Sequence, residues 1–211
     1  MMVSPLQKMS FRVRSLMDDR SGLAAVEFAM VFPIMAVMFF GVVEISSAVA
    51  VDRKATLVAR TLSDLTSQMA SVANADLLSF GETAKAIMTP YPGSPLISSI
   101  TEVYIDSASG AARVQWSKGL AIDTAGNVSI ASTPPHNQGD VVVLPTTLVA
   151  AKGTYVIWSE VSYKYTPAVG YVLAKTGLTF NDAAFTRPRT VLCVIYPTPP
   201  SGSSLPACPT L

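Results

Sequence analysis

Histidine and cysteine are scarce in this chain of 211 residues, which has one histidine, His136, and two cysteines, Cys193 and Cys208. Protein metal sites draw many of their ligands from these residue types, so the sequence gives no basis for a bound metal. The Gly-x-Ser-x-Gly motif and the phosphate-binding glycine loop are also missing. Carboxylates such as Glu102 and Glu160 stand singly, and we expect each to be solvated or in a structural ion pair. These absences argue against an enzyme and against a cofactor.

Charge is scarce as well. Charged residues make up 14% of the chain, and 15 basic residues against 14 acidic ones leave a net charge of +1. No cluster of Lys and Arg is interleaved with aromatic residues, so we expect no nucleic-acid partner. Hydrophobic residues make up 50% of the chain. A surface with little charge and much apolar area is suited to packing against other protein subunits.

One long segment is almost free of charge. Between Leu23 and Val51 only Glu27 and Glu44 are charged. An apolar run of about 18 residues or more can cross the roughly 30 Å hydrocarbon core of a bilayer. The run is about twice the length of the apolar region of a secretory signal peptide, and helices buried in soluble domains seldom stay apolar on all faces for this length. We therefore predict a transmembrane helix over residues 23–51, with a kink or local melting near Pro33.

The flanking charges predict how this helix is oriented. Residues 1–22 form a basic leader, which the positive-inside rule places in the cytoplasm (Lys8, Arg12, Arg14 and Arg20). Residues 52–196 would then form an α+β domain outside the cytoplasm, followed by a Pro/Ser-rich tail over 197–211. In an oxidising compartment Cys193 and Cys208 could form a disulfide; the alternative is two free thiols.

The helical pattern continues past the membrane segment. Apolar residues recur at alternating spacings of four and three (Val51, Ala55, Val58, Leu62, Leu65, Met69 and Val72). Such a stripe packs either on a sheet of the same domain or on a neighbouring subunit. A helix from Leu23 to Val72 would be about 75 Å long. A second helix is expected to start at Asn74 as N-cap and to end at Thr89–Pro90, with Gly81 as a weak point.

Beyond Pro95 the apolar pattern changes to the period of two that is typical of strands. Residues Thr101–Ser107 and Ala112–Lys118 predict a hairpin, and Thr154–Thr166 predicts a long strand with two distinct faces. Thr190–Tyr196 is expected to be the last strand, and residues 120–145 are expected to be rich in loops. Helices followed by hairpin-connected strands indicate an α+β fold with an antiparallel sheet.

The start of the apolar segment has a specific pattern: a basic leader, Gly22, four apolar residues beginning with Leu23, then Glu27 and Phe28. It resembles the prepilin-peptidase site of type IV-type pilins. The resemblance implies cleavage after Gly22 on the cytoplasmic side, which would leave Leu23 as the new amino terminus. Many pilins have Phe at this position, so whether Leu23 is N-methylated stays open. Glu27 would then either pair with the amino terminus of an adjacent subunit or stay hydrated at the interface.

More narrowly, residues Gly22–Ala29, Pro33 and the Gly41-x-x-Glu44 pair resemble the TadE-like proteins of tight-adherence (Tad/Flp) pilus systems. Residues 160–167 and 187–189 also resemble motifs of this family. The resemblance implies a minor pilin or pseudopilin of the bacterial inner membrane, with a single span and a periplasmic domain. A major pilin is little more than its helix, whereas this chain carries a domain as well.

The implied partners are other pilins and pseudopilins (a TadF-like protein and the major Flp pilin), the prepilin peptidase and the Tad inner-membrane assembly platform. The competing hypothesis is an unprocessed, single-pass periplasmic binding module or enzyme.

Overall fold

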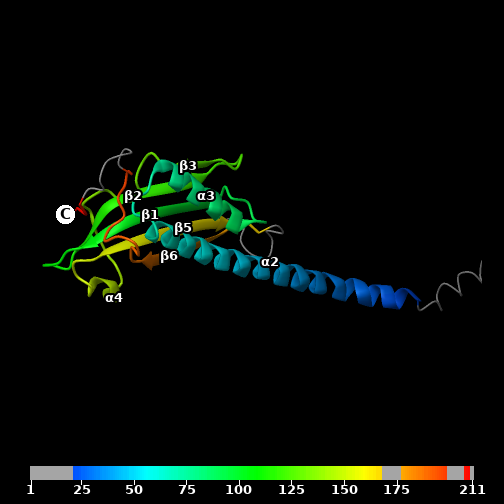
Figure 1. Ribbon diagram of the computed structural model, residues 1–211. Coiled ribbons are helices and arrows are strands. Elements are labelled where there is room, and N and C mark those ends of the chain that lie inside the picture. The colour runs from blue at the N-terminus through cyan, green and yellow to red at the C-terminus, as the bar shows by residue number, and fades with distance from the viewer. Residues whose placement is uncertain (1–20, 168–176, 199–206, 210–211) are drawn as a thin grey trace, which may run out of the picture.

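The computed structural model describes residues 21–167, 177–198 and 207–209. In chain order the helices are α2 (Ser21–Ser67), α3 (Asn74–Met88) and α4 (Thr146–Val149). The strands are β1 (Leu96–Ile105), β2 (Ala112–Ile122), β3 (Val128–Ile130), β4 (Val141–Val142), β5 (Tyr155–Tyr165) and β6 (Leu178–Thr186). The sheet is antiparallel with the order β3-β2-β1-β5-β6, and β4 pairs with β2. The predicted α+β fold is confirmed (Figure 1).

Helix α2 is one continuous helix of 47 residues, about 70 Å long at 1.5 Å per residue. It passes through Pro33 without the expected local melting. It ends at Ser67, earlier than Val72, because the chain then turns to meet a C-terminal segment. Ser71 forms a parallel bridge with Ile195, and the Val72 N–H donates to the Ile195 carbonyl at 2.9 Å.

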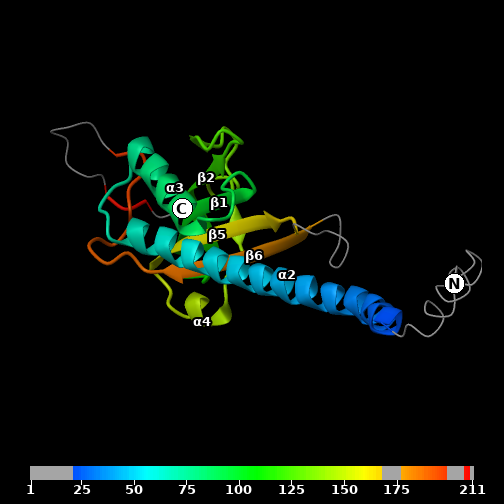
Figure 2. The same ribbon diagram turned by 90° about the vertical axis from the view of Figure 1, so that its right-hand side faces the viewer.

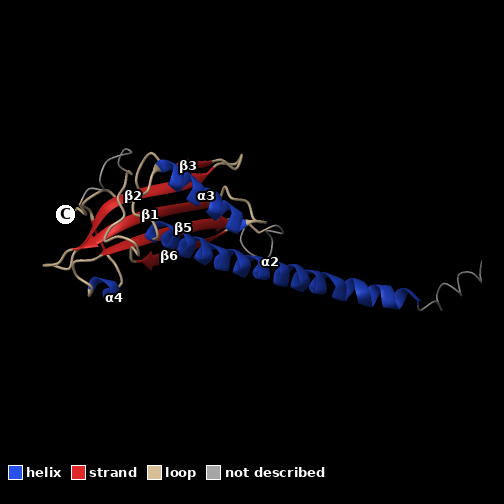
Figure 3. Ribbon diagram, in the orientation of Figure 1, coloured by secondary structure: helices blue, strands red, loops and turns tan. Residues whose placement is uncertain are grey.

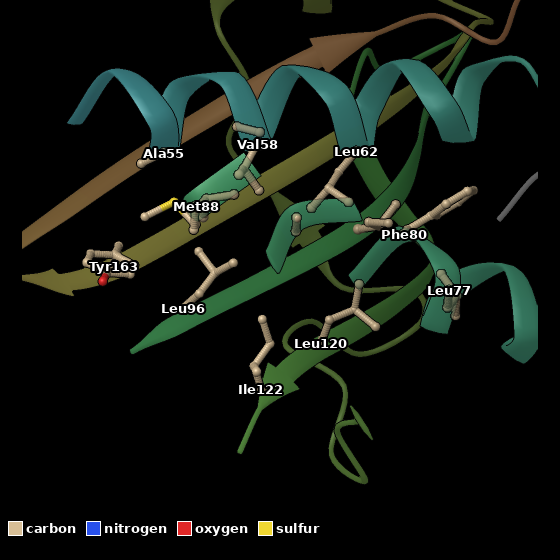
Figure 4. Packing of buried hydrophobic residues seen from close by; sticks show 14 of the residues in the cluster. Ala55, Val58, Leu62, Leu77, Phe80, Met88, Leu96, Leu120, Ile122 and Tyr163 are labelled. Atoms are coloured by element: carbon tan, nitrogen blue, oxygen red, sulfur yellow. The ribbon is translucent and has the colours of Figure 1, made fainter. Parts of the chain in front are cut away.

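The apolar stripe of α2 packs on the sheet of its own domain. Val51, Ala55, Val58 and Leu62 are fully buried, and they belong to the main core together with residues of α3, β1, β2 and β5. Figure 4 shows Val58 and Leu62 pointing from α2 toward the strands and α3. Of the two alternatives for this stripe, packing within the domain is therefore the one that the structure shows.

Helix α3 lies beside α2 on the same face of the sheet (Figure 3). Its N-cap is Ala73, one residue before the expected Asn74, and the Asp76 carboxylate accepts the Ala73 N–H at 2.8 Å. Gly81 does not break the helix. It is the point where α3 crosses β3, since a methyl group on Gly81 would overlap the Val128 side chain.

The hairpin of β1 and β2 and the long strand β5 lie where the sequence predicts them, and β1 and β2 are longer than expected. The two faces of β5 are also as predicted. Ile157, Val161 and Tyr163 face the helices, whereas Val156 and Trp158 pack in a smaller cluster on the opposite face.

The expected strand at Thr190–Tyr196 is wrong. The last strand is β6, and within 190–196 only Ile195 forms a bridge. The backbone donors of this segment bond to other groups: the Val194 N–H donates to the Glu102 carboxylate at 2.6 Å and the Ile195 N–H to the Ala70 carbonyl at 3.2 Å. Cys193 and Val194 are thus buried without pairing as strand residues, whereas Leu192 is 79% exposed.

Candidate functional site

The N-terminal half of α2 projects away from the domain (Figures 1 and 2). From Gly22 to Phe40 every residue is exposed except Ala36, which is half-buried. These 19 residues span about 28 Å at 1.5 Å per residue, close to the roughly 30 Å hydrocarbon core of a bilayer. Among the described residues α2 is the one helix long and apolar enough to cross a membrane. We refer to residues 22–40 as the free half of α2.

The residues expected to direct processing lie at the tip of the free half. No atom of the described residues beyond the helix itself lies within 4 Å of the position that a Cβ on Gly22 would occupy, and Leu23 and Phe28 are 59% and 62% exposed. Glu27 is exposed as well, one helical turn from Leu23 and therefore on the same side of the helix. The structure brings these residues together on consecutive turns, and none of them touches the domain core. They are thus open to another protein.

The Gly41-x-x-Glu44 pair marks the place where α2 meets the domain. Gly41 is the first buried residue of the helix, and Glu44 is 3% exposed. Packing against the domain therefore begins about ten residues before Val51, the boundary expected from the sequence. Farther on, the Lys54 ammonium donates to the Ile87 and Thr89 carbonyls at 2.6 and 2.8 Å. A cation at these C-terminal carbonyls of α3 is favourable, and it holds the two helices together.

At the far end of the domain, Cys193 and Cys208 are joined by a disulfide. This bond ties residues 207–209 to the segment that meets the end of α2. The Tyr155 hydroxyl donates to the Pro209 carbonyl at 2.6 Å, and its ring lies 4.9 Å from that of Tyr104. Burial, with the nearby Glu102 and Tyr104, raises the pKa of Tyr155 to about 12. Its hydroxyl is therefore a hydrogen-bond donor at physiological pH.

Glu102 is neither solvated nor ion-paired, in contrast to the expectation from the sequence. It is 1% exposed, and its two oxygens accept the Val194 N–H at 2.6 Å and the Trp116 indole N–H at 3.0 Å. Burial raises the pKa of Glu102 to about 8, against the lowering effect of these two donors. The carboxyl group fixes the segment around Cys193 to the sheet. Its place on the helix-facing side of β1, with Ile100, is the signal that could have revealed its burial.

Glu160, for which the sequence left a solvated role or a structural ion pair open, contacts His136. The His136 Nε2 lies 2.8 Å from the Glu160 Oε2, and the ring stacks on Trp158 with centroids 4.8 Å apart. The Ser99 hydroxyl donates to the same Glu160 oxygen at 3.1 Å. In the part of the chain that the structure describes, no group of three metal-ligating side chains comes together. The arrangement fastens the loop that carries His136 onto the face of the sheet opposite α2.

A comparison with known protein families finds a match over α2. The family model described as TadE-like protein matches residues 22–63, which is the free half of α2 and most of its packed half. No curated protein and no solved structure matches the chain. The match contains Gly22, Glu27, Phe28 and the Gly41-x-x-Glu44 pair, so the resemblance is confirmed over the helix. The motifs at 160–167 and 187–189 lie outside the matched residues.

Proposed function

We propose that the chain, whose N-terminal helix matches the TadE-like family model over residues 22–63, is a minor pilin or pseudopilin of the Tad pilus system. The observation that carries the proposal is the free half of α2. It is apolar on all faces, it starts with the Gly22-to-Phe28 pattern, and it continues as one helix into a folded domain. A helix with these properties can be inserted in a membrane and can later pack in a bundle of similar helices.

The proposed topology follows from the same helix. The leader lies in the cytoplasm, α2 crosses the bacterial inner membrane up to about Gly41, and the domain lies in the periplasm. An oxidising periplasm is consistent with the disulfide between Cys193 and Cys208. A reporter enzyme inserted at Ser107, an exposed residue between β1 and β2, tests this. Activity of a cytoplasm-dependent reporter at that site would contradict the topology.

The proposed processing step is cleavage after Gly22 by a prepilin peptidase. Among the described residues, nothing beyond its own helix lies within 4 Å of the position that a Cβ on Gly22 would occupy, which is consistent with access of a peptidase to this backbone. The peptidase must unwind the first turn of α2, because Ser21 and Gly22 are helical, and glycine lowers the cost of leaving the helix. The proposed partners are the peptidase, other pilins and pseudopilins, and the assembly platform.

N-terminal sequencing of the protein from native membranes tests the cleavage. The mature chain should start at Leu23, and Gly22→Lys should leave the full-length chain uncut. Arg20→Lys keeps the charge of the leader and serves as the control, with processing expected at the normal level. A start at Met1 in cells with an active prepilin peptidase would disprove the proposal, as would normal cleavage of Gly22→Lys.

Glu27 is proposed to set the register of subunit docking. A carboxylate one turn inside an apolar helix costs a few kcal/mol in a bilayer unless it is paired. The amino group of Leu23 on an adjacent subunit would offset much of that cost after cleavage. Glu27→Gln keeps the shape and removes the charge. If the variant is processed and inserted but pili are lost, Glu27 acts in docking; normal piliation would show that the charge is not needed.

A further inference from the structure

The two edges of the sheet differ in how far their backbone groups are hydrogen-bonded. Along the outer edge of β2, three segments pair with the strand: β3, β4 and the turn at Gly139–Asp140. In this turn the Asp140 carbonyl accepts the Val114 N–H, and the Gly139 N–H donates to the Val114 carbonyl. Along the outer edge of β6, no backbone group of the described residues pairs with the strand. Unpaired edges are sites for strand addition, and proteins commonly block them with Lys, Pro or a bulge. β6 contains no Lys, Pro or bulge, and its one charged residue is Asp182.

The direction of the free backbone groups can be assigned. The Lys164 N–H of β5 donates to the Pro95 carbonyl on the β1 side, so by alternation the backbone groups of Ser159 face β6, where the register places Ala184 opposite Ser159. The Ala183 N–H instead meets the carboxylate of Asp182, its own neighbour, at 2.7 Å. Because the two sides of a strand alternate along the chain, the backbone groups of Ala183 and Phe185 point away from β5. Thr179 points outward by the same alternation.

These outward groups line a groove of about 540 Å³ between β6 and α2. β6 contributes residues 183–186, α2 contributes Arg60, Thr61, Asp64 and Leu65, and Arg189 lies at one end. Arg189 pairs with Asp64. Arg60 is exposed and has no ionic or hydrogen-bond partner among the described residues. The groove thus combines a row of backbone donors and acceptors with one unpaired cation. Figure 2 shows β6 running beside α2 at the margin of the sheet.

We propose that this groove binds an extended segment of another protein chain by strand addition to β6, with a carboxylate side chain of that segment on Arg60. Backbone groups of Ala183 and Phe185 supply the pairing, and the alternate side chains of the added strand face α2. The Asp182 carboxylate occupies the Ala183 N–H in the free protein. The incoming strand displaces the Asp182 carboxylate, so this carboxylate competes with the bound segment for the Ala183 N–H.

A second copy of this chain is a poor occupant. Two copies that pair β6 with β6 in a closed, antiparallel dimer are related by a twofold axis perpendicular to the strands. α2 lies lengthwise over β5 and β6 and leaves the domain at one end (Figure 1). The twofold axis would therefore point the two free halves in opposite directions, and only one of them could enter a given membrane. A β6–β6 dimer is disfavoured only if α2 anchors the chain in a membrane, whereas the strand-addition site does not depend on processing at Gly22.

The test is a selection of displayed random decapeptides on the purified full-length chain in lipid nanodiscs. Enriched peptides should alternate β-branched and other residues and should contain one acidic residue. Proline removes an N–H without disturbing the side of β6 that faces β5, so Ala183→Pro should weaken binding of a selected peptide at least tenfold. Thr179→Pro makes the same change outside the groove and should leave binding unchanged. Arg60→Glu should also weaken binding about tenfold, with Arg53→Glu, on an exposed turn of the same helix, as its control.

The outcomes separate the possible occupants. A selected peptide that is N-methylated at alternate residues should lose binding if it pairs as a strand. Failure to enrich any peptide, or equal binding to the protein and to the Ala183→Pro variant, would overturn the proposal. Ala183→Cys chains that crosslink into homodimers in membranes would assign the edge to a second copy and would overturn it as well. None of these results depends on whether the chain is cleaved, so failure here leaves the processing experiment to stand by itself.

Discussion

The more apolar half of α2 is the more exposed half. From Gly22 to Phe40 apolar side chains cover all faces of the helix and none belongs to a core cluster of the described residues, whereas from Val51 to Ser67 most of them form one stripe, of which Val51, Ala55, Val58 and Leu62 are fully buried. Burial of apolar surface drives folding, so a stripe explains a helix that packs on a sheet. A helix apolar on all sides requires a surrounding apolar phase, which the domain does not supply. The two halves of the helix are therefore suited to two different surroundings: the free half to an apolar phase, and the packed half to the core of a folded domain.

The largest effect should come from the packed half. Leu62 is fully buried between the sheet and α3, so Leu62→Ala should lower the free energy of unfolding of the domain by roughly 3–5 kcal/mol. Leu57 is the matched control, since it lies on the same helix and is 52% exposed. Leu57→Ala should cost less than about 1 kcal/mol. Urea unfolding followed by the fluorescence of Trp116 and Trp158 measures both, and equal losses would show that the stripe does not carry the packing.

The parts of the fold that repeat a pattern were predictable from the sequence. The stripe of α2, the hairpin of β1 and β2 and the two faces of β5 follow from periods of about four and of two, and each lies where the pattern predicts it. The start of the free half was also visible, because seven consecutive residues carry a recognisable spacing. Local patterns specify local structure when packing follows the same period.

The features that the sequence did not predict depend on contacts between segments that are distant in the chain. β6 contains Asn181, Asp182 and two alanines, residues with low strand propensity, yet it pairs with β5 along its whole length. The more strand-like run at 190–196 is taken up by the end of α2, the Glu102 carboxylate and the disulfide. The burial of Glu102 likewise arises from a segment about ninety residues away in the sequence. No local pattern could reveal these pairings, although the place of Glu102 on the helix-facing side of β1 could have indicated that it is buried.

Removing the disulfide is a second test of the contacts that stabilise the packed half of α2. The disulfide secures the segment that meets α2 just past Ser67, where Val72 bonds to Ile195. Replacing Cys193 and Cys208 by serine should lower the free energy of unfolding by about 3 kcal/mol, because the unfolded chain is no longer constrained. Reduction of the unaltered protein should give the same loss. A change below about 1 kcal/mol would mean that the segment is held by its other contacts alone.

The pH dependence of unfolding tests Glu102. Its pKa is about 8 in the folded domain against a reference value of 4.5, so the folded state binds the proton more tightly. The stabilisation is fully present below about pH 4.5 and is lost as the pH rises to about 8. Between pH 6 and pH 8 the free energy of unfolding should fall by roughly 2 kcal/mol. Glu102→Gln should remove this slope, and Glu82→Gln, at an exposed position of α3, should retain it.

The smallest effect should come from the free half. Phe28 is 62% exposed, and its ring contacts Phe32 on the same helix at a centroid distance of 5.4 Å. Because neither ring touches the core, Phe28→Ala should change the free energy of unfolding of the domain by less than about 0.5 kcal/mol. The same urea titration in nanodiscs measures it. A loss above about 1 kcal/mol would show that the tip of α2 is coupled to the domain. The division into two halves with different surroundings would then be wrong, since a substitution in the bilayer would be altering the packing on the sheet.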